Sequence, residues 1–332
     1  MTKVLLIGAT PPPIGGVSMH IQRFVEQFQD HDSECHLDVL DLKKRELYSS
    51  KKRLSLIQIF RTIGSSSIIH LHISSNLKIL VACLSKVLGK KVVYTHHNIR
   101  IKNQFFFKLF MFFVDKLILV NDKDIDQRIR QKYKYTLIPA FLPSMDKTKL
   151  PISLENALDR FDHVISTNCF EMTFVDGRDL YGFDLCVESF NKLVQTNAIK
   201  NTVLVLVDPS GSSKEYVYKL LKNFTPNNGC EILFVGESIN FNALIEASSV
   251  VLRATRSDGD SLTVREALYL QTPIIASDVT IRPKGTICFK NEDSSDLALI
   301  IKKVLDSKTS KPKIKYENVN YGKAVFDLYN TL

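Results

Sequence analysis

Short apolar runs alternate with amphipathic stretches through the first 139 residues of the sequence. The runs are rich in Val, Ile and Leu, which is typical of strands that are buried on both faces of a sheet. They predict strands at residues 4–9, 36–42, 68–73, 91–96, 117–120 and 136–139. The stretches between them repeat apolar residues at helical spacing and predict helices at residues 17–29, 54–63, 77–88, 104–114 and 123–131. This alternation predicts a parallel sheet with helices on both sides.

The same alternation restarts after residues 140–151, which contain Pro143 and Pro151 and which we interpret as a linker. Beyond the linker, strands are expected at residues 164–167, 202–207, 231–235, 250–254, 274–277 and 286–289. Helices are expected at residues 183–195, 214–223, 242–247, 262–270 and 294–305, followed by a terminal helix at 321–332. The sequence therefore predicts two doubly wound α/β domains, at residues 1–145 and 146–315, with a ligand cleft between them at the carboxyl ends of the strands.

The composition excludes several classes of protein. An apolar share of 45% with a charged share of 24% is incompatible with a disordered chain. The longest apolar stretch, residues 105–114, is interrupted by Lys108 and is shorter than the ~20 residues that a transmembrane helix needs. The N-terminus lacks the apolar core of a signal peptide. The six cysteines include no C-x-x-C pair, so we expect reduced cysteines, no zinc site and a cytoplasmic protein.

The positive charge is confined to the first half of the chain. Residues 1–145 hold 22 Lys and Arg against 11 Asp and Glu, a net +11, whereas residues 146–332 hold 22 against 24, a net −2, which together give +9. In the first half, residues 105–114 contain six Phe, and residues 51–61 combine cations with an apolar stripe. Aromatic side chains beside Lys and Arg are typical of a surface that binds an anionic membrane. A buried helix beside a solvated basic helix is the alternative.

Nucleic acid is the other partner that a basic domain suggests. The sequence has neither the spacing of a helix-turn-helix nor the strand aromatics of an RNA-binding platform. We therefore expect no nucleic acid partner.

A glycine-containing loop directly follows the first predicted strand. Residues 10–17 read T-P-P-P-I-G-G-V, and Gly15 and Gly16 would let the backbone approach an anion at the start of the next helix. Neither the G-x-G-x-x-G dinucleotide fingerprint nor the P-loop is present. The loop is consistent with a phosphate-binding turn, and a stiff proline turn is the alternative.

The most informative segment spans residues 253–268. Ser261 is a favourable N-cap for the helix that follows it. Asp258 lies in the loop before this helix, and Glu266 lies over its first turns. The amides between the two carboxylates are expected to bind a phosphate; they belong to Gly259, Asp260, Ser261 and Leu262. Carboxylates suit sugar hydroxyls, because each accepts two hydrogen bonds from a vicinal diol.

This segment resembles the E-x7-E signature of the retaining family 4 glycosyltransferases, with Asp258 in the first position. Residues 271–277 (Q-T-P-I-I-A-S) resemble the family's G-x-P-V-I-A-S strand, and residues 181–185 (Y-G-F-D-L) resemble its K-G-x-D-L helix start. The resemblance covers most of the chain. It implies the GT-B fold, in which two Rossmann-like domains face a cleft, and a terminal helix at residues 316–332 that crosses back onto the N-terminal domain. It also implies a nucleotide-diphosphate sugar as donor, with no bound metal and no cofactor.

The resemblance implies roles for particular residues. His97 aligns with a histidine that contacts the donor sugar, and we expect it to be catalytic together with Asp258. Gly15 and Gly16 are expected beside the donor diphosphate, and Glu266 is expected to bind the ribose. A structural, hydrogen-bonded role is the alternative for His97 and for its neighbours in the pattern, which are His70, His72 and His96.

Two cations that this family uses at the diphosphate are missing. Residues 166–169 read S-T-N-C in place of a motif with Arg, and Tyr181 replaces a Lys. Arg178 and Arg253 are the nearest substitutes, because Arg can clamp a phosphate with two hydrogen bonds. An ordinary surface charge is the alternative for each.

We therefore expect a cytoplasmic glycosyltransferase, peripheral on the inner face of the cell membrane. It would transfer a sugar with retention from a nucleotide sugar to a polyprenyl-linked glycan in the biosynthesis of a bacterial surface polysaccharide such as O-antigen or capsule. Two alternatives stay open: a non-catalytic GT-B subunit that binds a sugar or nucleotide, and an NAD-dependent dehydrogenase, which the missing glycine fingerprint disfavours.

Overall fold

The chain folds into two compact units. One consists of Met1–Met145 with Asn318–Leu332, and the other of Asp146–Glu317; we call them unit 1 and unit 2. The computed structural model describes residues 2–11, 16–29, 35–97, 103–120, 131–138, 141–144, 146–258, 261–307 and 321–332. In these residues no helix combines the length and the apolar character needed to cross a bilayer. All six cysteines are free of disulfide bonds.

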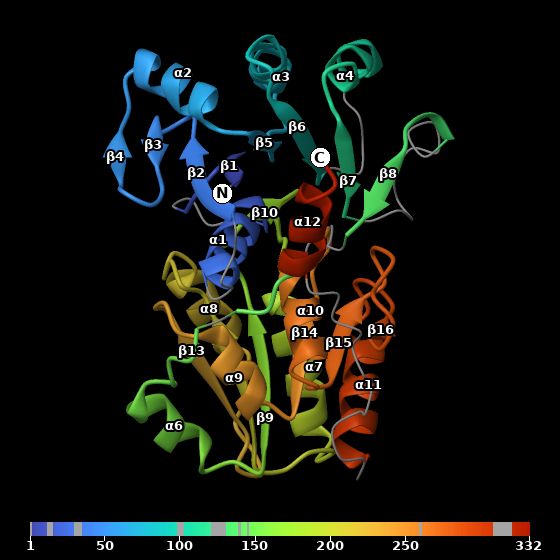
Figure 1. Cartoon of the computed structure of the whole chain (residues 1–332). Helices are drawn as coiled ribbons and strands as arrows, with labels where there is room; N and C mark the ends of the chain where they lie inside the picture. The colour runs from blue at the N-terminus through green and yellow to red at the C-terminus, as the bar shows by residue number, and fades with distance from the viewer. Residues whose placement is uncertain are drawn as a thin grey trace. The chain divides into compact units, whose positions relative to one another are not determined.

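Unit 1 is built on an eight-stranded sheet in the order β4-β3-β2-β1-β5-β6-β7-β8 (Figure 1). Six of these strands run parallel, and those at the centre are buried because helices cover both faces. The six are β1 (Thr2–Ile7), β2 (Cys35–Asp41), β5 (Ile68–Leu71), β6 (Lys91–His96), β7 (Lys116–Leu119) and β8 (Tyr135–Leu137).

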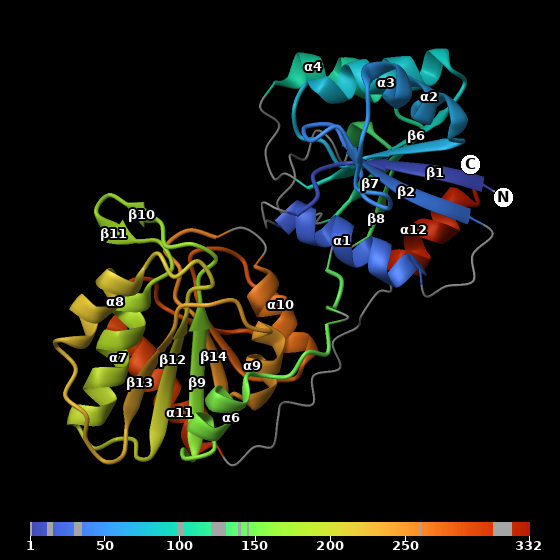
Figure 2. The same cartoon turned by 90° about the vertical axis from the view of Figure 1, so that its left-hand side faces the viewer.

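Helices cover the two faces of this sheet in separate layers (Figure 2). One layer packs Ile59, Val81 and Phe107 against the sheet. The opposite layer buries Phe24 and Val325. The first layer contains α2 (Leu56–Ser65), α3 (Leu77–Val87) and α4 (Gln104–Met111), and the second contains α1 (Gly16–Gln29) and α12 (Tyr321–Tyr329). Helix α12 therefore belongs to unit 1, although the whole of unit 2 precedes it in the chain.

Two short strands absent from the sequence prediction extend the sheet of unit 1. They are β3 (Glu46–Leu47) and β4 (Lys52–Arg53), which continue antiparallel from the end of β2. Each is two residues long, and a strand of that length leaves no recognisable alternation of apolar and polar positions. The predicted helix at residues 123–131 falls almost entirely outside the described residues.

Unit 2 is built on a six-stranded, wholly parallel sheet in the order β13-β12-β9-β14-β15-β16. All six strands were expected from the apolar runs. They are β9 (His163–Asn168), β12 (Thr202–Val207), β13 (Glu231–Val235), β14 (Val250–Arg253), β15 (Ile274–Ser277) and β16 (Ile287–Phe289). The prediction of a doubly wound α/β architecture is thus confirmed in both units.

Helices again cover both faces of the sheet in unit 2. One face carries α7 (Phe183–Gln195), α8 (Lys214–Leu221) and α11 (Ser294–Asp306), and the other carries α6 (Ile152–Leu158), α9 (Phe241–Ala247) and α10 (Leu262–Tyr269). The sequence pattern did not predict α6, which follows Pro151 at the end of the expected linker. It also did not predict a small hairpin, formed by β10 (Phe174–Val175) and β11 (Arg178–Asp179).

A glycine allows the start of α7 to lie very close to the end of β14. Gly182 has a φ of 73°, and a Cβ atom there would lie 2.2 Å from the backbone oxygen of Ala254. Only glycine permits both this backbone conformation and this close approach. The position therefore fixes α7 against the carboxyl edge of the sheet, where the candidate site lies.

Candidate functional site

The strand order of unit 2 reverses direction at its first strand. The chain proceeds from β9 outward through β12 and β13, then returns to β14 on the other side of β9. In open parallel sheets of this kind, ligands bind at the carboxyl ends of the strands where the order reverses. Here those ends are Asn168 on β9 and Arg253 on β14. Topology thus selects the same region that the sequence segment 253–268 indicated.

The first turn of α10 is fixed at this reversal point. The hydroxyl of Ser261 accepts a hydrogen bond from the amide of Val264 (3.4 Å), which confirms the predicted N-cap. The hydroxyl of Thr263 donates to the side-chain oxygen of Asn168 (3.0 Å) and so ties the helix to the end of β9. Leu262 is the first helical residue, as expected. The predicted phosphate-binding residues Gly259 and Asp260 lie outside the described residues.

Asp258 lies between two guanidinium groups. Its carboxylate accepts hydrogen bonds from Nε and Nη2 of Arg253 (3.2 and 3.3 Å) and from Nη1 of Arg282 (2.8 Å). The Arg282 side chain is only 2% exposed, and it also donates to the backbone oxygen of Ser277 at the end of β15 (2.9 Å). The three side chains together carry a net charge of +1, which favours an anionic ligand.

Tyr181, at the position where the sequence resemblance leads us to expect a Lys, contacts the same cluster. The guanidinium of Arg253 lies over the ring of Tyr181, 5.3 Å from its centroid, a distance suited to a cation–π interaction. Arg253 is therefore held by the ring of Tyr181 and by the carboxylate of Asp258. Arg253 thus places a cation beside Tyr181, the position at which a Lys was expected.

The second predicted substitute, Arg178, has a different partner. Its guanidinium donates to Glu292 (2.6 Å), and its side chain is 55% exposed. Glu292 also faces Arg256 (3.6 Å), whose guanidinium donates two hydrogen bonds to Asp184 (2.9 and 3.0 Å). The structure thus places Arg178 in an exposed ion-pair network beside the β10–β11 hairpin, and its role at a donor diphosphate stays a prediction.

Glu266 lies on α10 and is buried. A buried carboxylate requires compensation by hydrogen bonds or charge, and it is a strong acceptor for ligand hydroxyls. Its predicted contact with a ribose stays a prediction.

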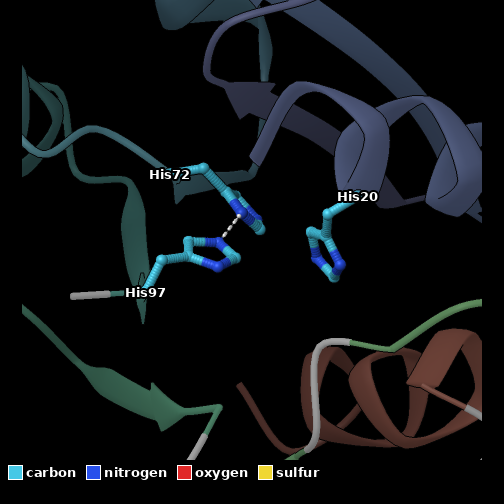
Figure 3. A group of neighbouring side chains, drawn as sticks. All are labelled: His20, His72 and His97. Atoms are coloured by element: carbon cyan, nitrogen blue, oxygen red, sulfur yellow. Dashed lines mark hydrogen bonds between the residues drawn. The ribbon is translucent and has the colours of Figure 1, made fainter. Parts of the chain in front are cut away.

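Three histidines converge at the corresponding place in unit 1. There the strand order reverses between β1 and β5; His20 lies on α1, His72 directly follows β5, and His97 directly follows β6. Nδ1 of His72 and Nε2 of His97 are hydrogen-bonded at 2.8 Å, and the ring of His20 lies beside both, with centroid distances of 5.4 and 5.1 Å (Figure 3). We call these three residues the histidine trio.

Burial keeps His72 and His97 neutral at physiological pH. The pKa values of His72 and His97 lie well below the usual histidine value, because burial disfavours the charged rings and neighbouring imidazoles repel a second proton. Nε2 of His72 is buried and has no hydrogen-bond partner among the described residues. Neutral rings can donate to and accept from an uncharged hydroxyl.

The trio is also the group of described residues best placed to hold a metal ion. Its candidate ligand nitrogens all lie within 4.8 Å of one another, and three histidines form a ligand set that zinc accepts. The group contains no carboxylate or thiolate. The expectation of a metal-free protein stays a prediction.

Two side chains, at the end of β2 and just after it, hold the loop that follows β1. The Asp41 carboxylate accepts hydrogen bonds from the amide and hydroxyl of Thr10 (2.9 and 3.1 Å). The ammonium group of Lys44 donates to the backbone oxygens of Thr10 and Pro11 (2.7 and 3.0 Å). These contacts hold the beginning of the predicted phosphate-binding turn and place a cation beside it. Gly15 lies outside the described residues, and Gly16 begins α1.

Several of these residues were not found from the sequence. Arg282 lies 24 positions after Asp258 and reaches it only because β14 and β15 are neighbours in the sheet. His20 lies in no recognised motif. Its position on the helix that follows β1 would have indicated that it lies near the carboxyl ends of the strands. Lys44 lies beyond the next strand, and only the pairing of β1 with β2 brings it to the loop.

Comparisons with known proteins agree with this architecture. Residues 159–320 match the family described as glycosyl transferases group 1, a match that spans most of unit 2. No curated protein sequence matches the chain.

Solved structures with the same fold cover the whole chain. Alr3699/HepE from Anabaena, in complex with UDP, has a TM-score of 0.67 at 12% identity, with 100% of both chains covered. The apo form of the lipopolysaccharide outer core galactosyltransferase WaaB has a TM-score of 0.61 at 13% identity, also with 100% of both chains covered. Sucrose-phosphate synthase from Thermosynechococcus elongatus has a TM-score of 0.60 at 15% identity, covering 100% of this chain and 95% of its own. The fold is GT-B. This fold and the family match together support the assignment of the chain as a GT-B glycosyltransferase.

Proposed function

We propose that this GT-B chain is a retaining glycosyltransferase that transfers a sugar from a nucleoside-diphosphate sugar to a lipid-linked glycan. The observation that carries the proposal is the cluster of Arg253, Asp258 and Arg282 beside the capped start of α10, at the point where the strand order of unit 2 reverses. It combines a net positive charge, helix amides and buried carboxylates, which are the groups that a nucleotide sugar requires.

Each group has a proposed role toward the donor. The amides of Ser261 and Leu262, with Gly259 and Asp260 before them, bind the diphosphate, and Arg253 offsets its charge. Glu266 accepts hydrogen bonds from the ribose hydroxyls. Asp258 orients the two guanidinium groups and, when the donor is bound, accepts a hydrogen bond from the sugar.

Retention follows if the acceptor attacks on the face from which the diphosphate departs. The bond between the anomeric carbon and the phosphate oxygen breaks, the acceptor oxygen bonds to the same carbon, and the departing phosphate takes the acceptor proton. The transition state resembles an oxocarbenium ion, so catalysis depends on stabilising the negative charge that develops on the leaving group. In unit 1, His97 is proposed to contact the transferred sugar, with Gly15 and Gly16 beside the diphosphate.

The proposed acceptor is a polyprenyl-linked glycan in bacterial surface polysaccharide biosynthesis, reached from the cytoplasmic face of the membrane. One structure with this fold holds UDP, which supports the class of donor. Another is a lipopolysaccharide outer core galactosyltransferase, which supports a surface glycan as acceptor. The basic charge of residues 1–145 also suits an acceptor that resides on an anionic membrane.

Binding and turnover test the proposal separately. Calorimetry with UDP, GDP and ADP is expected to detect binding of at least one nucleotide, and Arg253→Gln is expected to weaken it about tenfold. A panel of nucleotide sugars is expected to show donor hydrolysis or transfer that Asp258→Asn and Glu266→Gln abolish while the protein stays folded. Glu215→Gln, on the exposed first turn of α8, is the matched control. Near-full activity of both site variants would overturn the assignment.

A non-catalytic binding subunit is the second candidate. It is favoured by one observation: both carboxylate oxygens of Asp258 already accept hydrogen bonds from arginine. Nucleotide binding without turnover of any donor in the panel would support this second candidate.

A further inference from the structure

The layer of α2, α3 and α4 in unit 1 has two apolar sides. The inner side packs on the sheet through buried residues such as Ile63, Ala82 and Phe110. The outer side carries large apolar side chains that are 39 to 83% exposed, and we call it the outer helical face. Its members are Leu56, Ile57, Phe60, Leu77, Leu80, Val87, Phe105, Phe106, Leu109 and Phe112.

This concentration of exposed apolar residues is local. The ten residues of the outer helical face are half of the twenty exposed large apolar side chains among the described residues. The rest are spread over several elements of both units, for example Ile152 on α6 and Leu299 on α11. Isolated apolar side chains are normal on a protein surface, whereas a grouped set indicates an interaction site.

The run of six phenylalanines contributes to both sides of the layer. Phe107 and Phe110 are buried in the core, whereas Phe105 and Phe112 are 72% and 83% exposed. The buried positions are three apart, as helical geometry requires for one face. The sequence left two alternatives for this run, a membrane-binding surface and a buried helix. Neither describes all six phenylalanines, because one side of α4 is core and the other faces solvent.

The sequence that carries this face is strongly basic. Residues 47–114, which include all three helices, contain eleven Lys and Arg and no Asp or Glu. Among the described residues six of these cations are exposed: Lys51, Lys52, Arg53, Arg61, Lys91 and Lys108. Lys78 differs, because it is buried and donates a hydrogen bond to the hydroxyl of Tyr94 (3.1 Å).

We propose that the outer helical face docks onto an anionic lipid membrane. Apolar and aromatic side chains on helices that lie in one layer (Figure 2) can enter the boundary between headgroups and acyl chains together. The exposed cations match the negative surface of such a membrane. The flanking carboxylates are fewer: Glu46 lies opposite Arg53, and Asp115 pairs with Lys86 (2.6 Å). A second copy of the chain would bring the same positive charges together, so charge complementarity favours the membrane over self-association.

The inference rests on the proposed function in one respect: membrane docking brings the enzyme to a lipid-linked acceptor. Docking itself needs neither donor nor acceptor. Its failure and the failure of the proposed function are therefore separable, because vesicle binding is measured without substrate, and nucleotide binding without lipid.

Sedimentation of the full chain with vesicles tests the proposal. Two kinds of vesicle are used: phosphatidylcholine alone, and phosphatidylcholine mixed with phosphatidylglycerol. The mixed vesicles are expected to bind the protein at least about tenfold more tightly at low salt, and high salt is expected to reduce that preference.

Variants of exposed residues separate the two contributions without disturbing the core. Leu80→Ala with Phe105→Ala and Phe112→Ala is expected to weaken binding to mixed vesicles by about tenfold or more. Lys51→Gln, Lys52→Gln and Arg53→Gln together are expected to remove most of the preference for the anionic lipid. Exposed residues of unit 2 give matched controls that should bind like the unmodified chain: Ile152→Ala with Leu299→Ala, and Lys214→Gln with Lys219→Gln and Lys222→Gln.

Three outcomes would overturn the proposal. One is equal binding to both kinds of vesicle, and another is an equal loss in the unit 2 controls. The third is a dimer in solution that the apolar triple variant converts to monomer while vesicles bind neither form, because the face would then be an interface between copies.

Discussion

Nδ1 of His72 lies 2.8 Å from Nε2 of His97, so each imidazole determines which nitrogen of the other carries the proton. Both rings are neutral, because burial lowers the pKa of each well below the usual value. One ring donates and the other accepts, and this orients the predicted catalytic histidine within the trio.

Substitution of His97 or His72 is expected to reduce sugar transfer to different extents. His97→Ala should lower kcat about 100-fold or more if the ring acts directly on the transferred sugar. His72→Ala should lower kcat about tenfold, since it removes a single orienting hydrogen bond. His72→Asn, which can retain that bond, should recover part of the loss. Steady-state kinetics with the exposed His36→Ala as control measures this, and equal losses in all variants would exclude an orienting role.

The stability of the fold is expected to fall in mild acid. Burial lowers the pKa of His70 to about 3 and that of His96 to about 4. Because the unfolded chain binds these protons first, the stabilisation is complete above about pH 6.5 and is lost as the pH falls toward the folded-state pKa. Each such histidine should contribute a slope of up to about 1.4 kcal/mol per pH unit in that window.

Urea unfolding between pH 7.5 and 5 measures this slope. His70→Gln should reduce it, since glutamine can hydrogen-bond to Tyr329 and Thr95 as His70 does but does not titrate. Exposed His36→Gln should leave it unchanged. An unfolding midpoint that is constant over this range would contradict the expectation.

Two ion pairs of similar length are expected to differ in their contribution to stability. Arg282 and Asp258 are buried, so Arg282→Leu should cost about 3 kcal/mol by leaving a buried carboxylate with one cation. Arg178 and Glu292 are exposed, and Arg178→Leu should cost less than about 1 kcal/mol. Chemical denaturation of both variants gives the comparison. If the order were reversed, Arg282 would not stabilise the cluster.

Two glycines in the left-handed region provide a matched pair. Gly182→Ala should destabilise unit 2 by about 3 kcal/mol or more, because the new Cβ would collide with the backbone of Ala254 in addition to the unfavourable φ. Gly177→Ala has a similar φ but open space around it, and should cost only about 1 kcal/mol. Thermal unfolding distinguishes them. Equal losses would mean that the close approach to β14 is unimportant.

The fold was largely predictable because its parallel strands and amphipathic helices have clear periods. Helix α7 was predicted with the observed bounds, Phe183–Gln195, since its apolar stripe is complete and Gly182 precedes it. The four short strands and α6 were missed. A strand of two residues has no period, and α6 is only seven residues long and follows Pro151 directly.

The candidate site was predictable only where it is continuous in the chain. Ser261 and Asp258 lie within one segment and follow from its turn and cap chemistry. The contact of Asp258 with Arg282 and the convergence of His20 on His72 depend on which strands are neighbours, and sequence spacing does not contain that information. The pairing of Arg178 with Glu292 depends on tertiary structure in the same way, and its role at a donor diphosphate stays a prediction.

The return of α12 to unit 1 has a consequence for how the protein is made. Val325 and Leu328 complete one core of unit 1, and the hydroxyl of Tyr329 reaches Nδ1 of His70 (2.5 Å). The ribosome synthesises these residues only after the whole of unit 2. Unit 2 can therefore finish folding during translation, whereas unit 1 waits with one layer of its sheet incompletely covered. The part of the chain synthesised first is the part whose folding ends last, and it exposes apolar surface to chaperones for longest.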